Sequence, residues 1–264
     1  MESVHSINAV NLVGSGNVAW VLGSALKESG VLINAVIARK KDKAEELARL
    51  LDSKALSFED KLPKADLILL TVSDDSIQEV SEQLAKKVSN ESLIAHTSGS
   101  KPTTLLAPFG RQASFYPLQT MTKGNVVDFS KVHFCVYTKE ESHLNALKEL
   151  AGRISQHVHI LDNQQRAFLH LSAVMVNNFS NLFFSEAYRL SAMHKIDFEL
   201  LRPLIMKTAQ KAMENIPGSV QTGPAARNDI DTIQQHLNLL ESDPKLKELY
   251  QLISERIIKN ADTD

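Results

Sequence analysis

The sequence predicts an α/β fold, a Rossmann-type and mostly parallel sheet followed by a second, all-helical domain. Short β-branched runs alternate with amphipathic helical patterns through residue 161, as in parallel sheets with crossover helices. A glycine-rich turn follows the first of these runs. From residue 162 onward the apolar spacing is helical throughout. We therefore expect a first domain at residues 1–161 and a second at residues 162–264.

The expected strands of the first domain are short and apolar. The run at residues 67–72 is nearly continuous, which is typical of a strand buried on both faces of a sheet. Helical patterns with charged faces separate most of the runs. We expect strands at residues 9–13, 35–38, 67–72, 93–96, 113–116, 133–137 and 158–161, and helices at residues 18–27, 41–51, 77–88 and 142–154.

The second domain begins with an unusually long helical pattern. Residues 163–194 contain neither proline nor glycine, although helices of globular proteins usually run for three or four turns. Proline and glycine then separate three shorter patterns. These predict helices at residues 198–214, 232–240 and 246–258.

Composition excludes several classes of function. The formal net charge of −2 and the pI near 6.5 argue against an electrostatic nucleic-acid footprint. No uncharged apolar run reaches membrane-spanning length, and no N-terminal signal is visible. Cys135 lies in an apolar run and has no partner for an internal disulfide, so we expect a reduced core residue in a cytoplasmic protein. Metal ligands at usable spacing are lacking, and we expect no metal.

The turn after the first strand matches a dinucleotide-binding fingerprint. Residues 14–19 read G-S-G-N-V-A, and they follow a strand and open a helix. The first glycine permits a tight turn, the second lets the backbone approach a pyrophosphate, and the alanine allows close helix packing. Amides at the helix start would face the phosphates. The alternative is an ordinary glycine-rich turn. The cofactor contacts expected here are Gly14, Ser15, Gly16, Asn17 and Val18.

The end of the second strand favours NADP over NAD. Enzymes that bind NAD place an acidic residue there for the ribose 2′-hydroxyl. Here the strand runs into Arg39 and Lys40, and the first acid is Asp42. A guanidinium at this point could bind a 2′-phosphate with two hydrogen bonds. The other interpretation is a solvated start to a lysine-rich helix, since Lys41 and Lys43 continue the basic run.

Two further loops follow strands, at the edge of the sheet where ligands bind in such folds. In the loop at residues 71–75 we expect Val72 and Ser73 beside the cofactor, and an aspartate that can cap the next helix. In the loop at residues 96–100, Ser98 offers a hydroxyl and Gly99 an unobstructed amide. Both groups suit a substrate carboxylate or carbonyl. His96 is interpreted as a strand-end histidine rather than as a catalyst.

Four motifs carry a resemblance to a known family: H-T-S-G-S, F-Y-P-L-Q-T-M, an N-N-F on the long helix, and T-G-P-A-A-R-N-D. With the Rossmann half, they resemble a group of NADP oxidoreductases whose helical C-terminal domain has no characterised function. That group is related to pyrroline-carboxylate reductase, ketopantoate reductase and 3-hydroxyisobutyrate dehydrogenase. The resemblance covers nearly the whole chain. It implies hydride transfer between NADPH and a small carbonyl or imine substrate, with a ketopantoate-like 2-keto acid as the leading candidate.

The chain departs from the family pattern at two positions. Tyr116-Pro117 stands where many members carry His-Pro. The hydroxyisobutyrate dehydrogenases carry a catalytic lysine in a K-x-x-N-N arrangement on the long helix. Here Asn177 and Asn178 match the asparagine pair, but Val174 occupies the lysine position. An NADP-binding sensor or regulatory protein without catalytic activity therefore stays as the alternative function.

We select His170 as the residue that could replace the lysine as proton donor. It lies four residues before Val174, on the same helix face one turn earlier, and imidazole titrates near neutral pH. A packing or subunit-contact role is the alternative. The family match makes Asn177 a polar catalytic ligand and places Asn178 near the substrate, where it could equally be an interface residue. Tyr116 could point its hydroxyl into the cleft, or be a half-buried aromatic residue with a solvated hydroxyl.

The helical domain suggests a substrate anchor and an interface. Arg227, after a turn, could bind a substrate carboxylate, or it could bridge two helices. The long helix carries apolar residues on more than one face, and such a helix must be covered on most sides. We therefore expect a homodimer formed through the C-terminal helices. The apolar residues in question are Leu169, Val174, Phe179, Leu182, Phe183 and Phe184.

Overall fold

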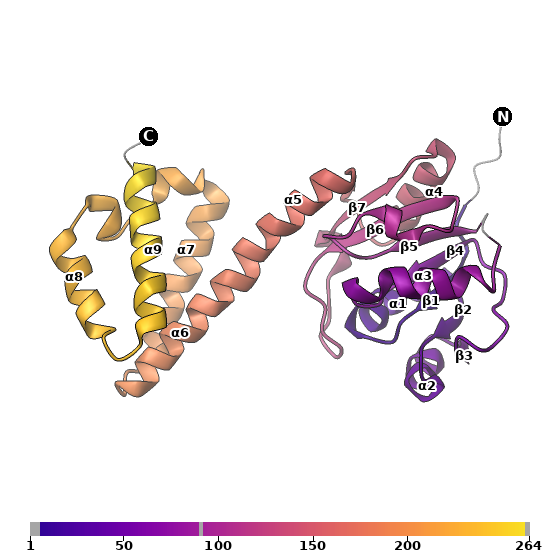
Figure 1. Cartoon of the computed structure of the whole chain (residues 1–264), viewed down its shortest axis with the longest axis horizontal. Helices are drawn as coiled ribbons and strands as arrows, with labels where there is room; N and C mark the ends of the chain where they lie inside the picture. The colour runs from indigo at the N-terminus through magenta and orange to yellow at the C-terminus, as the bar shows by residue number, and fades with distance from the viewer. Residues whose placement is uncertain (1–5, 90–91, 262–264) are drawn as a thin grey trace. The chain divides into compact units, whose positions relative to one another are not determined.

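The structure is a computed structural model that describes residues 6–89 and 92–261 (Figure 1). It divides into two compact units, of which the first ends at Asn181 and the second begins at Leu182. The first unit contains a sheet and its flanking helices. The second is helical throughout the described residues. The predicted fold class is thus confirmed.

The first unit is built on an eight-stranded sheet in the order β3-β2-β1-β4-β5-β6-β7-β8. All neighbouring strands pair in parallel except β6 and β7, which are antiparallel. The strand order reverses at β1, and dinucleotides bind at the carboxyl ends of strands beside such a reversal. The strands are β1 Ala9–Val13, β2 Leu32–Ile37, β3 Lys54–Leu56, β4 Leu67–Leu70, β5 Leu93–His96, β6 Arg111–Leu118, β7 His133–Thr138 and β8 Val158–Ile160.

Helices cover both faces of this sheet, as the continuous apolar run predicted. Leu67 and Leu69 of β4 belong to a core that includes residues of α1, α2 and α4. The alternate residues Ile68 and Leu70 belong to a second core with α3 and the short helix η2. The helices of this layer are α1 Asn17–Glu28, α2 Lys41–Leu50, α3 Ile77–Ala85 and α4 Glu141–Gly152, with the 3-10 turns η1 Asp74–Ser76, η2 Thr103–Leu106 and η3 Phe129–Lys131 (Figure 1).

Strand β6 extends past the end of its neighbour β5. His96, the last residue of β5, pairs with Ser114, so the residues from Phe115 to Leu118 pair only with β7. That segment is a local sheet edge, where Pro117 is tolerated. The prediction ended this strand at Tyr116 and missed the extension. As a consequence, Tyr116 stands just beyond the carboxyl end of β5.

The sequence prediction differs from the structure at two other strands. β2 begins at Leu32, three residues before the predicted start, because it also pairs with β1 through Ala9 and Val10. The edge strand β3 was not predicted. It has three residues and begins with an exposed lysine, so it lacks the apolar run that marks a buried strand.

Burial supports the interpretation of the single cysteine. Cys135 lies in β7 and is almost fully buried. Burial raises the pKa of its thiol to about 11, so the side chain stays protonated near neutral pH and acts as a small apolar core residue.

The long helical segment after β8 contains an internal change of geometry. It begins with α5 (Asn163–Ala173), continues as the π-helical turn η4 (Val174–Phe179) and ends with α6 (Ser180–Met193). Asp162 and Gln165 form a capping box at its start. The predicted domain boundary at residue 162 coincides with this cap, whereas compactness divides the chain inside α6. A boundary at residue 162 remains a prediction from the sequence.

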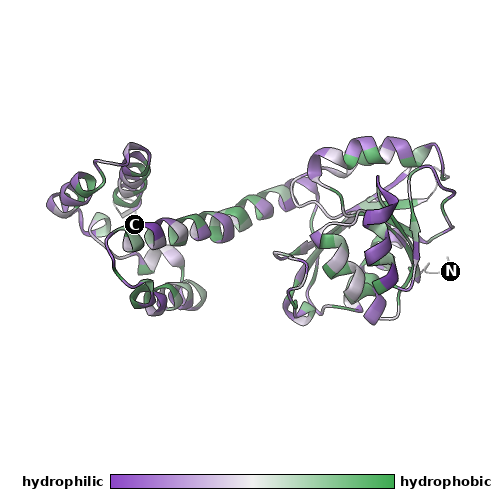
Figure 2. Ribbon diagram, turned by 90° about the horizontal axis from the view of Figure 1, so that it is seen from below, coloured by the Kyte–Doolittle hydropathy of each residue, from purple (hydrophilic) through white to green (hydrophobic). Residues whose placement is uncertain are grey.

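The second unit packs its helices around a small core. Ala225, Ile233 and Leu240 are each less than 10% exposed. Hydrophobic residues also recur along the helical segment α5–α6 (Figure 2). Among the described residues, no helix has the length and apolar character needed to cross a membrane. The remaining helices are η5 Phe198–Leu201, α7 Arg202–Glu214, η6 Pro217–Val220, η7 Ala225–Arg227, α8 Ile230–Leu239 and α9 Pro244–Ala261.

Candidate functional site

The turn between β1 and α1 requires glycine at its first position. Gly14 has φ +119°, and a Cβ there would lie 2.7 Å from Thr71 Oγ1 and 2.9 Å from the Thr71 carbonyl oxygen. Its N–H donates to the Ile37 carbonyl oxygen at 2.8 Å. At Gly16, the N-cap of α1, no side chain among the described residues accepts a capping hydrogen bond. The first amides of α1 therefore suit an anion such as a pyrophosphate.

A pocket of about 350 Å³ lies beside this turn. Seven of the nine predicted cofactor residues line it, namely Gly14, Ser15, Gly16, Arg39, Lys40, Val72 and Ser73. The side chains of the other two are used elsewhere: Asn17 Oδ1 accepts the Lys123 N–H at 3.1 Å, and Val18 packs against the core. Those two residues reach the site only through their backbone at the helix start.

The charge of this pocket suits a phosphate. Arg39, Lys40 and Lys43 line it, and no carboxylate belongs to the described lining. The Arg39 guanidinium pairs with Glu79 of α3 at 2.9 Å, and both side chains are more than half exposed. Lys43 and Phe58 were not predicted as site residues. Lys43 enters the sequence analysis only in the alternative interpretation, a solvated start to a lysine-rich helix, and Phe58 carries no sequence signal beyond its apolar character.

A second group of predicted residues meets at the carboxyl end of β5. Tyr116 Oη and His170 Nδ1 lie 3.2 Å apart, and their rings meet edge to face. A Cβ on Gly99 would lie 2.5 Å from His170 Nδ1 and 2.8 Å from Tyr116 Cζ. A strand, a loop and a helix that are far apart in sequence thus bring these three residues into contact. We call Gly99, Tyr116 and His170 the catalytic edge, after the catalytic role that the sequence predicts for Tyr116 and His170.

Burial keeps the tyrosine of this group neutral. Tyr116 is 9% exposed, and burial raises the pKa of its phenol to about 12. His170 is half-buried. The phenol therefore holds its proton at neutral pH and can take part in a hydrogen bond to imidazole as a neutral group. A neutral hydroxyl beside an imidazole can set which ring nitrogen carries a proton.

The loop after β5 is held by hydrogen bonds within itself. His96 is fully buried, and burial together with the nearby Arg166 guanidinium lowers its pKa to about 4. Its Nδ1 accepts the Ser98 N–H at 3.2 Å. Ser98 Oγ accepts the backbone N–H groups of Ser100 and Lys101 at 3.2 and 3.0 Å. His96 is thus a strand-end residue as expected, and Ser98 keeps only its hydroxyl proton to donate to a ligand.

Two aspartates join the loops at this edge of the sheet. Asp74 accepts a hydrogen bond from Ser100 Oγ at 2.7 Å, and Asp75 pairs with Lys101 at 3.4 Å. The expectation that one of these aspartates caps the following helix is wrong, because Ser73 occupies the N-cap position of η1. The two bonds instead connect the loop at residues 71–75, which lines the basic pocket, with the loop at residues 96–100, which carries Gly99.

Sequence reasoning missed the most buried polar residue of the site. Arg166 is completely buried although it lies in the second turn of α5. Arginine is mostly exposed in folded proteins, so the sequence offered no reason to select Arg166 as a buried residue. The only signal was its spacing of four residues from His170, which places both on one helix face.

Among the described residues, no hydrogen bond joins Asn177 or Asn178 to the catalytic edge. Asn177 and Asn178 are exposed on the π-helical turn η4. Turns of this kind occur frequently at functional sites. Arg227 is exposed and belongs to the second unit. The roles of these three residues remain predictions from the sequence.

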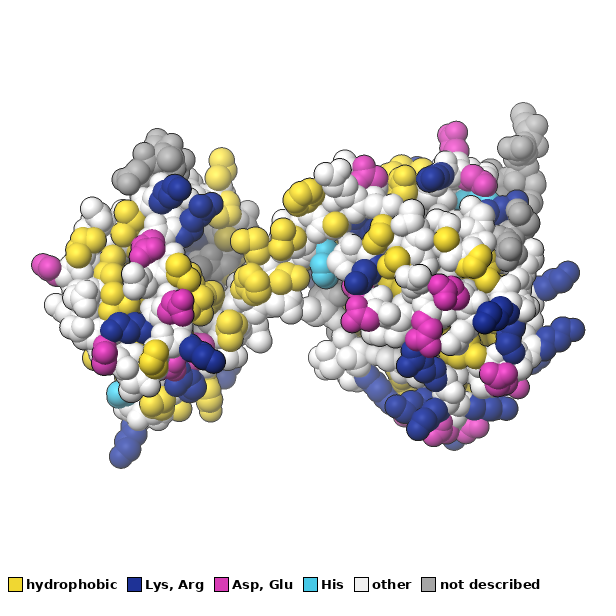
Figure 3. Space-filling model, viewed as in Figure 1, with side chains coloured by type: hydrophobic (Ala, Val, Ile, Leu, Met, Phe, Trp, Pro, Cys, Tyr) yellow, Lys and Arg dark blue, Asp and Glu magenta, His cyan; other side chains and the backbone are white. Residues whose placement is uncertain are grey.

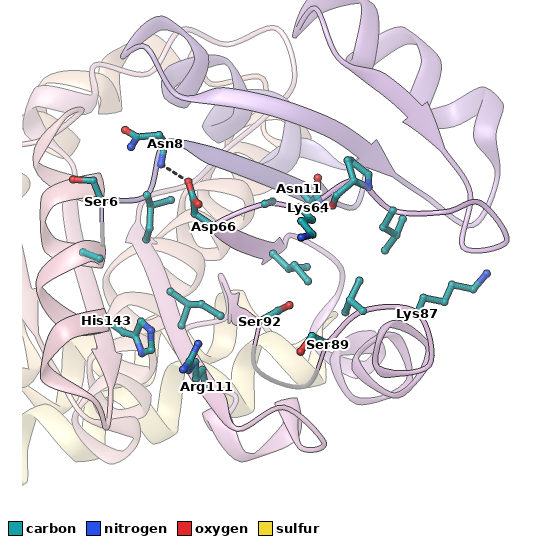
Figure 4. A pocket seen from close by; sticks show the side chains of 18 residues that line it. Ser6, Asn8, Asn11, Lys64, Asp66, Lys87, Ser89, Ser92, Arg111 and His143 are labelled. Atoms are coloured by element: carbon teal, nitrogen blue, oxygen red, sulfur yellow. Dashed lines mark hydrogen bonds between the residues drawn. The ribbon is translucent and has the colours of Figure 1, made fainter. Parts of the chain in front are cut away.

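A larger pocket, of about 820 Å³, lies at the opposite edge of the sheet (Figure 4). Asn8 and Asp66 line it near the starts of β1 and β4, and Asp66 accepts the Asn8 N–H at 2.9 Å. Ser92 and Arg111 line it at the starts of β5 and β6. Ligands of open α/β sheets bind at the carboxyl ends of the strands, so this amino-edge pocket is not the candidate site.

Family models match both parts of the chain. Residues 4–120 match a Rossmann-like domain, and residues 132–257 match a domain of unknown function, DUF2520. No curated protein matches the chain.

Solved structures match nearly the full length. A protein described as a "putative NADP oxidoreductase" from Bacteroides fragilis is 32% identical, with a TM-score of 0.86, and the match covers 97% of this chain and all of that one. An imine reductase from Myxococcus stipitatus in complex with NADP⁺ is 14% identical, with a TM-score of 0.68 and coverage of 97% and 93%. A pyrroline-5-carboxylate reductase from Coxiella burnetii is 16% identical, with a TM-score of 0.58 and coverage of 98% of each chain. The last two likenesses concern the fold.

Proposed function

We propose that this chain, which belongs to the family of proteins that join a Rossmann-like domain to a DUF2520 domain, is an NADP-dependent oxidoreductase. It would transfer hydride between NADPH and a small carbonyl or imine substrate. The observation that carries this proposal is the catalytic edge, where an imidazole and a neutral phenol meet at 3.2 Å. It lies at the same edge of the sheet as the glycine turn and the basic pocket.

The residues present fit NADP. Arg39, Lys40 and Lys43 would hold the 2′-phosphate, and the amides at the start of α1 would hold the pyrophosphate. The bound cofactor would supply or accept the hydride. No carboxylate belongs to the described lining, where an acid would repel the 2′-phosphate, and this supports NADP over NAD; Glu79, which pairs with Arg39, lies outside the lining.

The catalytic edge would move the proton that accompanies the hydride. When Tyr116 Oη accepts the His170 Nδ1–H, His170 Nε2 is the nitrogen that exchanges a proton. Protonated His170 then gives its Nε2 proton to the oxygen or nitrogen of the substrate and is left neutral, with Nδ1–H still bound to Tyr116. The high pKa of the phenol supports this division of roles, because Tyr116 stays neutral throughout.

The substrate class rests on family resemblance and on the polar groups of the loop after β5. A ketopantoate-like 2-keto acid is the leading candidate, and an imine is the other. The Ser98 hydroxyl and the Gly99 amide would bind a carbonyl or carboxylate. Asn177 is proposed as a polar catalytic ligand, with Asn178 and Arg227 as further substrate contacts.

We also propose that the protein acts as a homodimer formed through its C-terminal helices. Phe179, Leu182, Phe183 and Phe184 of the long helical segment are each at least 40% exposed, which leaves a wide apolar surface to be covered. Hydrophobic side chains group over this segment (Figure 3). A cytoplasmic location remains a prediction from the composition.

Two measurements test this function. NADPH oxidation would be followed with a panel of small 2-keto acids and cyclic imines, where turnover of one member supports the proposal. Tight NADPH binding without turnover of any member would favour the rival, a sensor that binds NADP without chemistry.

The second measurement uses His170→Ala. General acid catalysis by a positioned side chain typically contributes about a hundred- to ten-thousandfold. The variant should lose at least about a hundredfold in turnover and keep its NADPH affinity. His194→Ala, which changes an exposed histidine of the second unit, is the control. A His170→Ala enzyme that keeps most of its turnover would make His170 a packing residue and Tyr116 the better donor.

A further inference from the structure

Arg166 is the largest fully buried side chain in the described part of the chain. Its guanidinium uses every nitrogen. Nε donates to the Ser98 carbonyl oxygen at 3.1 Å, and Nη1 donates to Ser114 Oγ at 2.8 Å. Nη2 donates to the Lys101 carbonyl oxygen and to Asn163 Oδ1. Four acceptors from a loop, a strand and a helix thus surround one cation.

All four acceptors are neutral. No aspartate or glutamate among residues 6–89 and 92–261 pairs with the guanidinium. Taking an unpaired cation out of water costs several kcal/mol even after relaxation, and arginine cannot shed its proton to avoid that cost. The four neutral acceptors replace the water lost from the guanidinium, and they lie on the loop, the strand and the helix that form the catalytic edge.

Three of the four bonds of Arg166 end within two residues of Gly99 or Tyr116 in the sequence, and the fourth, to Asn163, stays within α5. The bonds to Ser98 and Lys101 hold the loop on either side of Gly99. Ser114 lies two residues before Tyr116 on the same face of β6. Arg166 itself lies one helical turn before His170. A single guanidinium therefore fixes the loop, the strand and the helix relative to one another.

We propose that Arg166 is the positioning residue of the catalytic edge, which holds the hydrogen bond between Tyr116 and His170 in register above Gly99. This proposal rests on the proposed function for its kinetic consequence alone. Arg166 has no exposed atoms with which to touch a substrate, so it acts through the groups it binds. The His170 and Tyr116 rings lie directly against Gly99, so that even a methyl group on Gly99 would collide with both rings. A small shift of the loop would therefore displace the rings.

The test follows the His170 side chain directly by ¹⁵N NMR, which requires no turnover. His170→Asn identifies its signals. Arg166→Met, Arg166→Lys and Ser114→Ala are compared with the wild type, and Arg153→Met is the matched control. Arg153 is a half-buried arginine that binds Asn8 and Glu149. We expect one preferred His170 tautomer in the wild type and in the control, and averaged tautomers in the Arg166 variants. Ser114→Ala removes only one of the bonds and should give a smaller change.

The kinetic arm uses the same variants with the substrate found in the panel. Misplacement of a catalytic group by about 1 Å can cost on the order of a hundredfold. Turnover should therefore fall by about tenfold to a hundredfold in the Arg166 variants, with NADPH affinity unchanged, and partly recover from Met to Lys. If Arg166→Met does not fold, the results for Arg166→Lys and Ser114→Ala decide whether Arg166 positions His170. Folded variants that keep the wild-type His170 tautomer would overturn the proposal. A changed tautomer in a protein without any turnover would contradict only the proposed function.

Discussion

Arg39 is the residue proposed to bind the 2′-phosphate, the group by which NADP differs from NAD. Its guanidinium lines the basic pocket next to Lys40 and Lys43. Arg39→Ala should weaken NADPH binding by about 1.5–3 kcal/mol, the range for hydrogen bonds to charged groups, and leave NADH nearly unchanged. Isothermal titration with both cofactors measures the difference. An equal loss for both would show that Arg39 does not read the 2′-phosphate.

Glu79, the ion-pair partner of Arg39, provides a second variant that tests the same phosphate contact. Its carboxylate lies 2.9 Å from the guanidinium that the phosphate must approach, so it competes for Arg39 and adds like-charge repulsion. Glu79→Gln should therefore tighten NADPH several-fold without affecting NADH. In an Arg39→Ala background this gain should shrink. Weaker NADPH binding by Glu79→Gln would show instead that the carboxylate orients Arg39.

His96 gives the fold a dependence on pH. Its pKa is about 4 in the folded chain and 6.5 in the absence of burial. Between these values the unfolded chain binds the extra proton, so stability is full above pH 6.5 and falls as the pH drops through about 4. The loss attributable to His96 amounts to about 3 kcal/mol at most. Urea unfolding of the wild type and of His96→Asn between pH 7.5 and 4 measures it.

His96 is replaced by asparagine in this test because the asparagine Oδ1 can still accept the Ser98 N–H. The wild type should lose stability faster than His96→Asn as the solution is acidified. His194→Asn, at an exposed position, serves as the control and should follow the wild type. Parallel curves for wild type and His96→Asn would mean that His96 is not the residue responsible.

At the scale of elements, the loop after β5 is the part of the site that tolerates an added side chain least. Gly99→Ala would place a methyl group 2.5 Å from His170 Nδ1 and 2.8 Å from Tyr116 Cζ, so one ring has to move. We expect turnover to fall by about tenfold or more while NADPH binding stays normal, since Gly99 does not line the cofactor pocket. Gly152→Ala, where the added methyl has open space, is the control. Full activity of Gly99→Ala would mean that the observed ring contact is not needed for catalysis.

The elements show which parts of the structure the sequence could reveal. Buried strands and the glycine turn have local patterns, so β1, β4 and β5 were found at or within two residues of their true ends. The extension of β6 and the edge strand β3 depend on pairing with a distant partner and leave little local trace. The π-helical turn has the same apolar spacing as its neighbours, so the sequence predicted one continuous helix.

The residues of the candidate site also fall into those with a local sequence pattern and those that only the fold brings together. Gly14 and Arg39 belong to local patterns that can be read from the sequence, and the structure places both on the lining of one pocket, while their roles toward a cofactor remain predictions. Tyr116 and His170 were selected separately, and only the fold shows that they form one hydrogen bond. Arg166 could not be found, because nothing local distinguishes a buried arginine with neutral partners from one on a solvated helix.

At the scale of the whole molecule, the exposed apolar surface predicts self-association. Phe168, Leu171, Met175 and Phe179 are each more than half exposed on the long helical segment. An isolated chain would leave this surface in water, at a cost proportional to its area. Sedimentation velocity at low micromolar concentration should show no major monomer. Phe179→Glu should weaken the assembly, whereas Leu50→Glu, an exposed apolar position on α2, should not. A single monomeric species in the wild type would contradict the prediction.

The chain is synthesised from its N-terminus, so the basic pocket and the contacts of the buried Arg166 become possible at different times. The contacts of Arg166 and His170 with Ser98, Ser114 and Tyr116 span 52 to 68 residues, whereas every residue that lines the basic pocket lies between Gly14 and Val80. A chain leaving the ribosome therefore contains every residue of its basic pocket before the residue of α5 that completes its catalytic edge. A ligand that binds a folded form stabilises it by mass action. In the proposed function, NADPH would therefore stabilise the folded sheet first, and act as a reactant only after helix α5 is in place.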